Sequence, residues 1–274
     1  MTTDILRHTP IEIHNGIHVK REDLCVSPNY ATMFPPFSKL RGVYEHIIGK
    51  KNEGFTHFGV LDTIHSQAGW GVAAFCKVLD LQCVNYYPMC KDEVQMRHNQ
   101  IKAQELGAIM VPLPATKSAV MWYQARKDFL LHYPNGTMVP NGLKLPDCVR
   151  GTADEVKTIP KELLCGTWVF SVSTGTIMAG VIRGIEEVTD PRKIQLIAHM
   201  GYSRSEDGLH KYLLDKSGVF NAKIQIVDEG YAYADRTDYP APFHCDPYYD
   251  RKAWKWIMEH KDELEQPIIF WNIG

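Results

Sequence analysis

The sequence lacks long apolar runs and any excess of one charge. No stretch approaches the roughly 18 consecutive apolar residues that a membrane-spanning helix requires, and the first ten residues carry no apolar segment of the secretory type. The formal net charge is −2, which gives no sign of a surface built for nucleic acid or for an anionic membrane. We therefore expect a cytoplasmic protein with no membrane partner.

Closely spaced cysteine pairs, which are typical of metal and redox sites, are also missing. The seven cysteines are an odd number, and no two of them form a C-x-x-C motif. This usage is typical of reduced thiols in the cytoplasm, most of which are core residues. The sequence predicts neither a disulfide framework nor a metal site.

What the chain does contain is an alternation of strand and helix signals in an ordinary composition, with 45% hydrophobic and 23% charged residues. Short apolar, β-branched runs alternate with helical periodicities, which predicts parallel sheets with helices on their faces. Strands are predicted over 17–20, 55–60, 83–87, 108–111, 167–172, 194–199, 222–226 and 267–271, and helices over 69–81, 92–106, 180–187 and 251–260. Pro88 and Pro112 are expected to end their strands, and residues 134–160 to form connecting loops.

The predicted fold class is therefore α/β, a two-lobed architecture of open parallel sheets. Ligands of such sheets bind beyond the carboxyl ends of the strands. The loops after Val60, Val172 and His199 are accordingly the expected place for a site.

An anion-binding pattern follows the strand over 167–172. Residues 171–180 read S-V-S-T-G-T-I-M-A-G, so small and hydroxyl side chains lead into a helix. Small side chains let backbone N–H groups approach an anion, and the helix N-terminus adds partial positive charge. The loop has no lysine, which disfavours a nucleoside triphosphate of the Walker type. An ordinary helix cap at Ser173 or Thr174 explains the loop equally well.

Two further segments are weaker when each is taken alone. Residues 62–71 read D-T-I-H-S-Q-A-G-W-G, in which Ser66 and Gln67 can donate hydrogen bonds and Gly69 leaves room for a ligand. Capping by Ser66 explains this loop slightly better. Residues 20–24 read K-R-E-D-L and residues 37–42 read F-S-K-L-R-G. A lysine at the start of an apolar helix, such as Lys39, is usually a solvated surface charge.

In this order, the segments resemble the fold-type II enzymes that depend on pyridoxal 5′-phosphate (PLP), the tryptophan synthase β-like group. The similarity is greater to the branch of 1-aminocyclopropane-1-carboxylate (ACC) deaminase and D-cysteine desulfhydrase. Residues 246–253, D-P-Y-Y-D-R-K-A, are similar to the D-P-V-Y-x-G-K-A stretch of that branch, and residues 267–274 to its apolar strand ending in H-T-G-G. The resemblance extends from Ile17 to Gly274. It implies a homodimer in which residues 1–40 and 150–274 form a large cofactor-binding domain and residues 41–149 a small α/β domain.

The resemblance also implies a role for each matching residue. Lys39 would hold PLP as a Schiff base and then move protons, with Ser66 and Tyr249 as further catalytic residues. The residues implied to bind the cofactor are Lys39, Gln67, Ser173, Thr174, Gly175, Thr176 and Asp250. The residues expected to contact the substrate are Ser66, Ala68, Gly69, Tyr202 and Arg204.

Two of these assignments have an alternative. An aspartate at position 250 beside the pyridine nitrogen would favour the protonated ring, which accepts electrons from the substrate Cα more fully. That chemistry indicates ring opening or decarboxylation, but a solvated Asp250 that caps the helix over 251–260 is an equally good explanation. Arg204 is suited to a carboxylate or to a bulkier group, although simple surface exposure explains it better.

Three functions follow from these residues. The leading hypothesis is a PLP-dependent lyase or deaminase that acts on an amino acid through a Lys39 Schiff base and a carbanion or quinonoid-type intermediate. The departures from the deaminase pattern, with prolines at 35 and 36, Gln67 in place of asparagine and Ile273 in place of threonine, favour an alternative. That alternative is a PLP-dependent decarboxylase or synthase for an amino acid attached to a larger carrier, such as a modified nucleotide. Nucleic acid is expected only as such a carrier. The third hypothesis is a non-catalytic binding protein on the same scaffold.

Overall fold

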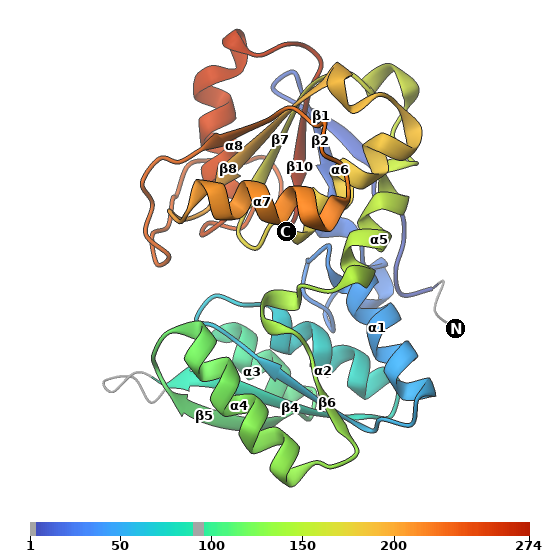
Figure 1. Ribbon diagram of the computed structural model, residues 1–274, viewed down its shortest axis with the longest axis vertical. Coiled ribbons are helices and arrows are strands. Elements are labelled where there is room, and N and C mark those ends of the chain that lie inside the picture. Colours follow the sequence, from blue (N-terminus) through green and yellow to red (C-terminus); the bar gives the residue numbers. More distant parts are fainter. Residues whose placement is uncertain (1–3, 90–95) are drawn as a thin grey trace. The chain divides into compact units, whose positions relative to one another are not determined.

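The computed structural model describes residues 4–89 and 96–274, and in it the chain divides into two compact units (Figure 1). The first unit contains the chain up to residue 27 together with residues 36–41 and 148–274, and the second contains residues 28–35 and 42–147. Helices α1 (Leu40–Asn52) and α5 (Pro146–Val156) each begin in one unit and continue in the other.

The first unit is built on a six-stranded sheet with the order β1-β2-β10-β7-β8-β9. Strand β1 runs antiparallel to β2, and the other neighbours are parallel. The strands are β1 (Ile11–His14), β2 (Ile17–Arg21), β7 (Gly166–Val172), β8 (Ile194–Met200), β9 (Ile224–Val227) and β10 (Ile268–Asn272). The main helices of this unit are α6 (Thr176–Val188), α7 (Glu206–Ser217) and α8 (Asp250–His260).

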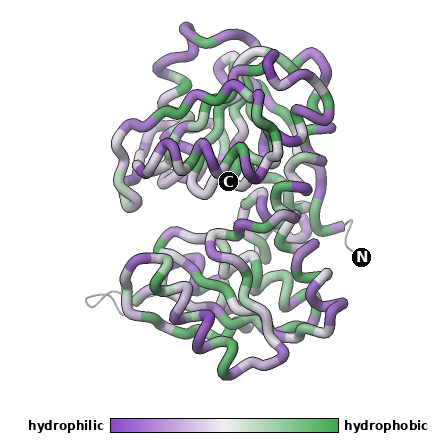
Figure 2. Tube along the Cα trace, in the orientation of Figure 1, coloured by the Kyte–Doolittle hydropathy of each residue, from purple (hydrophilic) through white to green (hydrophobic). Residues whose placement is uncertain are grey.

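Both faces of this sheet are covered, because every residue of its strand β7 is buried. Trp168 and Phe170 belong to a core with residues of α6 and α7, whereas Val169 belongs to a second core with Trp254 of α8. The tube of α7 alternates between hydrophilic and hydrophobic colours, as expected for a helix that covers one face of a sheet (Figure 2). Parallel strands covered on both sides are typical of this fold class.

The second unit has a four-stranded parallel sheet with the order β5-β4-β3-β6. Its strands are β3 (His57–Leu61), β4 (Gln82–Met89), β5 (Ile109–Pro114) and β6 (Gly136–Met138), and its helices include α2 (Ala68–Val78), α3 (His98–Glu105) and α4 (Ser118–His132). Leu61, Val84 and Phe129 form part of a core between the sheet and α4. The α/β class with parallel sheets is therefore confirmed.

The prediction of connecting loops over 134–160 is wrong. This region contains β6, a short 3₁₀ turn and α5. Pro146 is the first residue of α5, a position where proline fits a helix because the first N–H groups have no partner within it. Glycine and asparagine lie in the turns before it, and α5 buries Val149, Ala153 and Val156.

The two prolines expected to end strands also lie inside them. Pro112 belongs to β5, which is an edge strand. Pro88 belongs to β4, at a point where β3 has already ended at the pair Leu61–Tyr86 and only β5 continues alongside. A proline is tolerated where one side of its strand has no hydrogen-bonding neighbour.

The predicted helices agree with the structure only in part. Residues 92–95 of the helix predicted over 92–106 and Cys90 are not described, and the described helix α3 occupies His98–Glu105. Helices α4 and α7 were not among the predicted elements. Within residues 4–89 and 96–274, no helix is long and apolar enough to cross a membrane.

Candidate active site

Lys39 lies directly before α1 in the first unit, and it is only 8% exposed. Its stretch of backbone is fixed from three sides. The Ser38 N–H donates a hydrogen bond to the Ile273 carbonyl at 3.1 Å. The Cys148 thiol donates to the Lys39 carbonyl at 3.5 Å. The Cys25 thiol donates to the Phe37 carbonyl at 3.3 Å. The interpretation of Lys39 as a solvated surface charge is therefore wrong.

A chain of polar groups leads from the Lys39 amine to α7. Lys39 Nζ donates to Thr174 Oγ1 at 3.0 Å, Thr174 Oγ1 is hydrogen-bonded to Thr176 Oγ1 at 3.1 Å, and Thr176 Oγ1 to the Tyr212 hydroxyl at 3.0 Å. Two segments that are 135 residues apart thus meet at one point. An amine, two hydroxyl groups and a phenol can together bind an anionic group beside an electrophilic carbon.

The loop that carries Thr174 ends at Gly175, which has φ +88° and is the residue before α6, and Thr176 is the first residue of that helix. Glycine adopts this left-handed conformation without strain. The cap residue Gly175 has no side chain to cap the helix, but Thr174 Oγ1 accepts the Thr176 N–H at 3.5 Å, so the interpretation of a cap at Thr174 stands beside that of an anion site. Ser173 is half-buried in the same loop. The N-terminus of α6 is left with the partial positive charge that attracts an anion.

Asp250 is the first residue of α8, and it is 1% exposed. Its carboxyl oxygens accept the Ile273 and Gly274 backbone N–H groups, each at 3.2 Å. Burial raises the pKa of Asp250 well above its usual value, and the nearby carboxylates of Asp246 and Asp23 raise it further. The interpretation of a solvated helix cap is therefore wrong. A cationic group placed beside Asp250 would keep this carboxyl ionised.

Tyr249 and Tyr202 lie in one aromatic group with Tyr233. The Tyr249 hydroxyl donates to the Tyr233 hydroxyl at 3.2 Å, and the rings of Tyr202 and Tyr233 meet edge to face with centroids 5.1 Å apart. Burial raises the pKa of the Tyr249 phenol. Tyr249 is thus a neutral, hydrogen-bonded phenol rather than a ready base.

Arg204 follows β8 in the loop before α7, and it is half-buried rather than exposed on the surface. Its Nε and Nη2 atoms are buried, and neither has a hydrogen-bond partner among the described residues. Burial lowers the pKa of the guanidinium, and the phenols of Tyr202 and Tyr212 oppose this effect. The expectation that surface exposure explains Arg204 is wrong.

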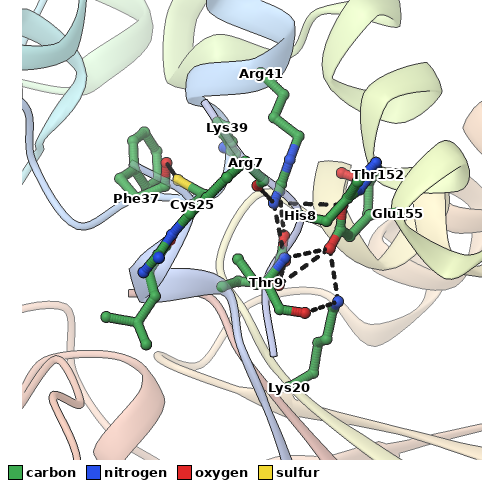
Figure 3. Close-up of polar contacts among 12 residues, drawn as sticks. Arg7, His8, Thr9, Lys20, Cys25, Phe37, Lys39, Arg41, Thr152 and Glu155 are labelled. Carbon is green, nitrogen blue, oxygen red and sulfur yellow. Dashed lines mark hydrogen bonds and ion pairs between the residues drawn. The ribbon is translucent and has the colours of Figure 1, made fainter. Parts of the chain in front are cut away.

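A buried ion network adjoins the segment that carries Lys39 (Figure 3). Glu155 of α5 accepts the ammonium group of Lys20 at 2.6 Å and the Thr9 N–H at 2.8 Å, and Arg41 Nη2 lies 3.5 Å from it. Arg41, two residues after Lys39, also donates to Glu22 at 2.6 Å. Burial raises the pKa of Glu155, but the charges of Arg41 and Lys20 outweigh it and hold the pKa at about 2.

In the second unit, Ser66, Gln67, Ala68 and Gly69 form the turn into α2. Ser66 Oγ accepts the Ala68 N–H at 3.1 Å, so Ser66 does have the capping role that was the alternative. Gln67 Oε1 is buried without a partner among the described residues, which fits a polar ligand. A Cβ at Gly69 would lie 2.1 Å from Asn85 Nδ2 and 2.3 Å from Asp62 Oδ2. The space beside Gly69 is therefore filled by these two side chains rather than open to a ligand.

Asp62 and Asn85 support this turn, although neither was among the predicted site residues. Asp62 is fully buried, and its carboxyl oxygens accept the Gly69 N–H at 2.7 Å and the Asn85 Nδ2 at 2.8 Å. Burial raises the pKa of Asp62 to about 6, in spite of these hydrogen bonds. Its position directly after β3 is the only signal that the sequence offered.

The structure brings part of the predicted set together. Within the first unit, Lys39 meets Thr174 and Thr176, and Tyr249 joins Tyr202 through Tyr233. The residues from Ser66 to Gly69 belong to the second unit and form a turn of their own. Tyr212 and Tyr233 were missed because nothing local in the sequence distinguishes them. Among the described residues, no group of three or more His, Cys, Asp or Glu side chains could hold a metal ion.

Comparison with known proteins gives one relative and several similar structures. No protein-family profile matches the chain. The chain is 43% identical, over 288 aligned residues, to the glycyl-dTMP PLP-dependent decarboxylase of Pseudomonas phage M6, and the match covers 98% of this chain and 99% of that protein.

Solved structures share the fold at much lower identity. An ACC deaminase homologue has a TM-score of 0.79 at 18% identity, with 99% of this chain and 90% of that chain covered. The O-acetylserine-dependent cystathionine β-synthase of Helicobacter pylori has a TM-score of 0.66 at 15% identity, with 99% and 94% covered. At such identities the likeness shows the fold alone.

Proposed function

This chain belongs to the family of fold-type II PLP-dependent enzymes that includes the phage decarboxylase, and we propose that it decarboxylates an amino-acid group carried on a nucleotide. PLP is its cofactor. The observation that carries the proposal is the 43% identity over nearly the full length of both proteins. The substrate class is taken from the phage relative, whose name gives a glycyl group on dTMP.

Residues of the first unit fit the cofactor. Lys39, with its amine 3.0 Å from Thr174 Oγ1, is the residue we assign to hold the PLP aldehyde carbon. Thr174, Gly175 and Thr176 would hold the phosphate, because the two hydroxyl groups converge at the N-terminus of α6, where the cap residue is a glycine. Asp250 would face the pyridine nitrogen, since this carboxyl is buried among other acids and gains most from a nearby cation.

The proposed reaction breaks the bond between Cα and the carboxylate carbon and releases CO₂. Bound PLP supplies an acceptor for the electron pair that remains at Cα. Lys39 would deliver a proton to Cα, and the Thr174 hydroxyl, which accepts from the lysine amine, would orient that amine for the transfer. Burial of Lys39 keeps bulk water from competing for the same carbon.

The leading hypothesis from the sequence, a lyase or deaminase, has weaker support than the decarboxylase. The structural neighbours that include a deaminase share less than a fifth of their residues with this chain, whereas the decarboxylase shares 43%. An Asp250 carboxylate at the ring nitrogen would serve ring opening and decarboxylation alike, so the choice between them rests on the sequence identity. The roles of Ser66 and Gln67 in the second unit stay predictions.

The products of the reaction test the proposal. The PLP-loaded enzyme is given glycyl-dTMP and, separately, a DNA oligonucleotide that carries a glycyl-thymidine, and CO₂, ammonia and the nucleoside products are measured. Release of CO₂ with retention of the amine is expected. Ammonia together with a keto acid would instead establish a deaminase.

Lys39→Ala tests the assignment of the lysine. Loss of a positioned acid–base group lowers rates by about 10²- to 10⁴-fold, and the visible absorption that PLP acquires on attachment to the protein should disappear. Lys157→Ala is the matched control, because Lys157 is an exposed lysine paired with Asp154 and Glu187. If Lys39→Ala kept the absorption and the rate of the control, the assignment of Lys39 would be wrong.

A further inference from the structure

Arg204 is a cation whose buried atoms have no counter-charge among the residues that the structure describes. Its Nε and Nη2 are buried without a hydrogen-bond partner among the described residues. The groups that act on its pKa, besides burial, are the phenols of Tyr202 and Tyr212, not carboxylates. Several other arginines of the same unit are paired with carboxylates, for example Arg192 with Asp190 at 2.7 Å. A buried guanidinium without a partner is costly, which indicates that an anionic ligand completes it.

The position of Arg204 ties it to the candidate active site. The loops after β7 and β8 leave the same edge of the sheet, because these two strands are parallel neighbours. The first loop carries Thr174 and leads into α6 at Thr176, and the second carries Arg204. Tyr212, whose hydroxyl lies 3.0 Å from Thr176 Oγ1, is one of the two phenols that act on Arg204.

Resting on the proposed function, we propose that Arg204 binds the phosphate of the nucleotide that carries the amino-acid group. The planar guanidinium fork matches a phosphate with two parallel N–H donors. The substrate carboxylate is a poorer occupant, because a strong contact to a group that must leave as CO₂ stabilises the ground state and slows the reaction. The cofactor phosphate has the same chemistry, but the hydroxyl groups of the loop before α6 already serve it in the proposed arrangement.

The test compares ligands that differ only in the phosphate. Dissociation constants of dTMP and thymidine are measured by calorimetry on the PLP-loaded wild type and on Arg204→Met. We expect the dTMP constant to rise about 10- to 100-fold, as loss of a charge-assisted hydrogen-bonded pair predicts. The dissociation constant of thymidine should not change. Arg204→Lys keeps the charge but not the planar fork of donors, so its dissociation constant for dTMP should lie between those of the wild type and Arg204→Met. Arg192→Met is the matched control and should bind dTMP like the wild type.

Two further measurements separate a ligand-binding role from other roles. The melting temperature of Arg204→Met without nucleotide should equal or exceed that of the wild type, because an uncompensated buried charge has been removed. A clearly lower melting temperature would mean that Arg204 is structural. PLP and pyridoxal differ by the cofactor phosphate. The ratio of their dissociation constants should therefore be the same for the wild type and for Arg204→Met.

Several outcomes would overturn the inference. The first is a dissociation constant for dTMP that does not change in Arg204→Met, and the second is a loss of thymidine affinity as large as that of dTMP. The third is a loss of the preference for PLP over pyridoxal, which would assign Arg204 to the cofactor phosphate instead. CO₂ release, measured in parallel, keeps the two proposals distinct. If CO₂ is released but dTMP binding is independent of Arg204, the phosphate site fails alone. If dTMP binding depends on Arg204 but no CO₂ is released, the proposed reaction fails alone.

Discussion

The buried pair between Glu155 and Lys20 gives a quantitative prediction for the substitution Glu155→Gln. Both side chains are 1% exposed, and their charged atoms are 2.6 Å apart. The pKa of Glu155 is held at about 2, compared with its usual 4.5. Each unit of pKa corresponds to about 1.4 kcal/mol, so the ionised form contributes about 3 kcal/mol to stability at neutral pH. Breaking one side of a buried pair costs a similar amount, about 3–5 kcal/mol.

Glu155→Gln should therefore lower the free energy of unfolding by about 3 kcal/mol at pH 7. The loss falls at the lower end of the range because the cations keep other partners. Arg41 keeps Glu22, and Lys20 keeps the Thr9 carbonyl, the Thr158 hydroxyl and the face of the Trp271 ring. Because the pKa of Glu155 is lowered by folding, its contribution is complete above pH 4.5 and declines as the pH falls towards 2. The wild type should thus approach the variant in acid.

Urea unfolding followed by circular dichroism measures the difference between wild type and variant. Glu187→Gln is the control, because exposed ion pairs such as those of Glu187 with Lys157 and Arg183 contribute little to stability. In the double variant with Lys20→Met the loss should shrink, since no unpaired buried charge remains. A loss of less than about 1 kcal/mol in Glu155→Gln, or a double variant that simply adds the two single losses, would refute the reasoning.

Two shorter predictions concern the other buried acids. The pKa of Asp62 is raised to about 6 from 3.8 by burial, so its contribution to stability is complete below pH 3.8 and about 3 kcal/mol is lost as the pH rises through 6. Asp62→Asn should remove that part of the pH dependence of urea unfolding, and an unchanged profile would contradict it. Asp250→Asn should lower the decarboxylation rate about 10²- to 10³-fold, as loss of one preorganised electrostatic group does. The visible absorption of bound PLP should persist in this variant. A decarboxylation rate like that of the wild type would mean that Asp250 does not face the cofactor.

Most strands of both sheets could be predicted because their signal is local, whereas β1 and the three-residue β6 were missed. A run such as Gly166–Val172 is mostly apolar and contains β-branched and aromatic residues, which is typical of a strand covered on both faces. The same reasoning failed between 134 and 160, where Gly, Pro and Asn content concealed α5. Proline predicts a break only inside a helix or a central strand, and Pro146 begins a helix while Pro112 lies on a sheet edge.

The candidate site could be predicted only where several segments act together. The meeting of Lys39 and Thr174 could be inferred from the order of motifs, not from either motif alone. The network around Glu155 could not be inferred from the sequence, because it joins residues 20, 41 and 155 through tertiary contacts that leave no periodic pattern. The burial of Arg204 was missed for the same reason, since a single arginine in a loop carries no local sign of its surroundings.

The charges of the first unit differ in whether the chain itself compensates them, and that difference separates structural from functional groups. Glu155 is as deeply buried as Asp250, yet its pKa is lowered because Lys20 and Arg41 face it. The pKa of Asp250 is raised by burial and by other acids, just as burial lowers the pKa of Arg204, which no carboxylate opposes. A fold under selection for stability alone has no reason to keep an uncompensated acid and an uncompensated base on the same unit. The compensation that the chain does not supply is what a cationic ring nitrogen and an anionic phosphate would supply. Ligand binding should therefore stabilise the first unit by more than its buried area predicts.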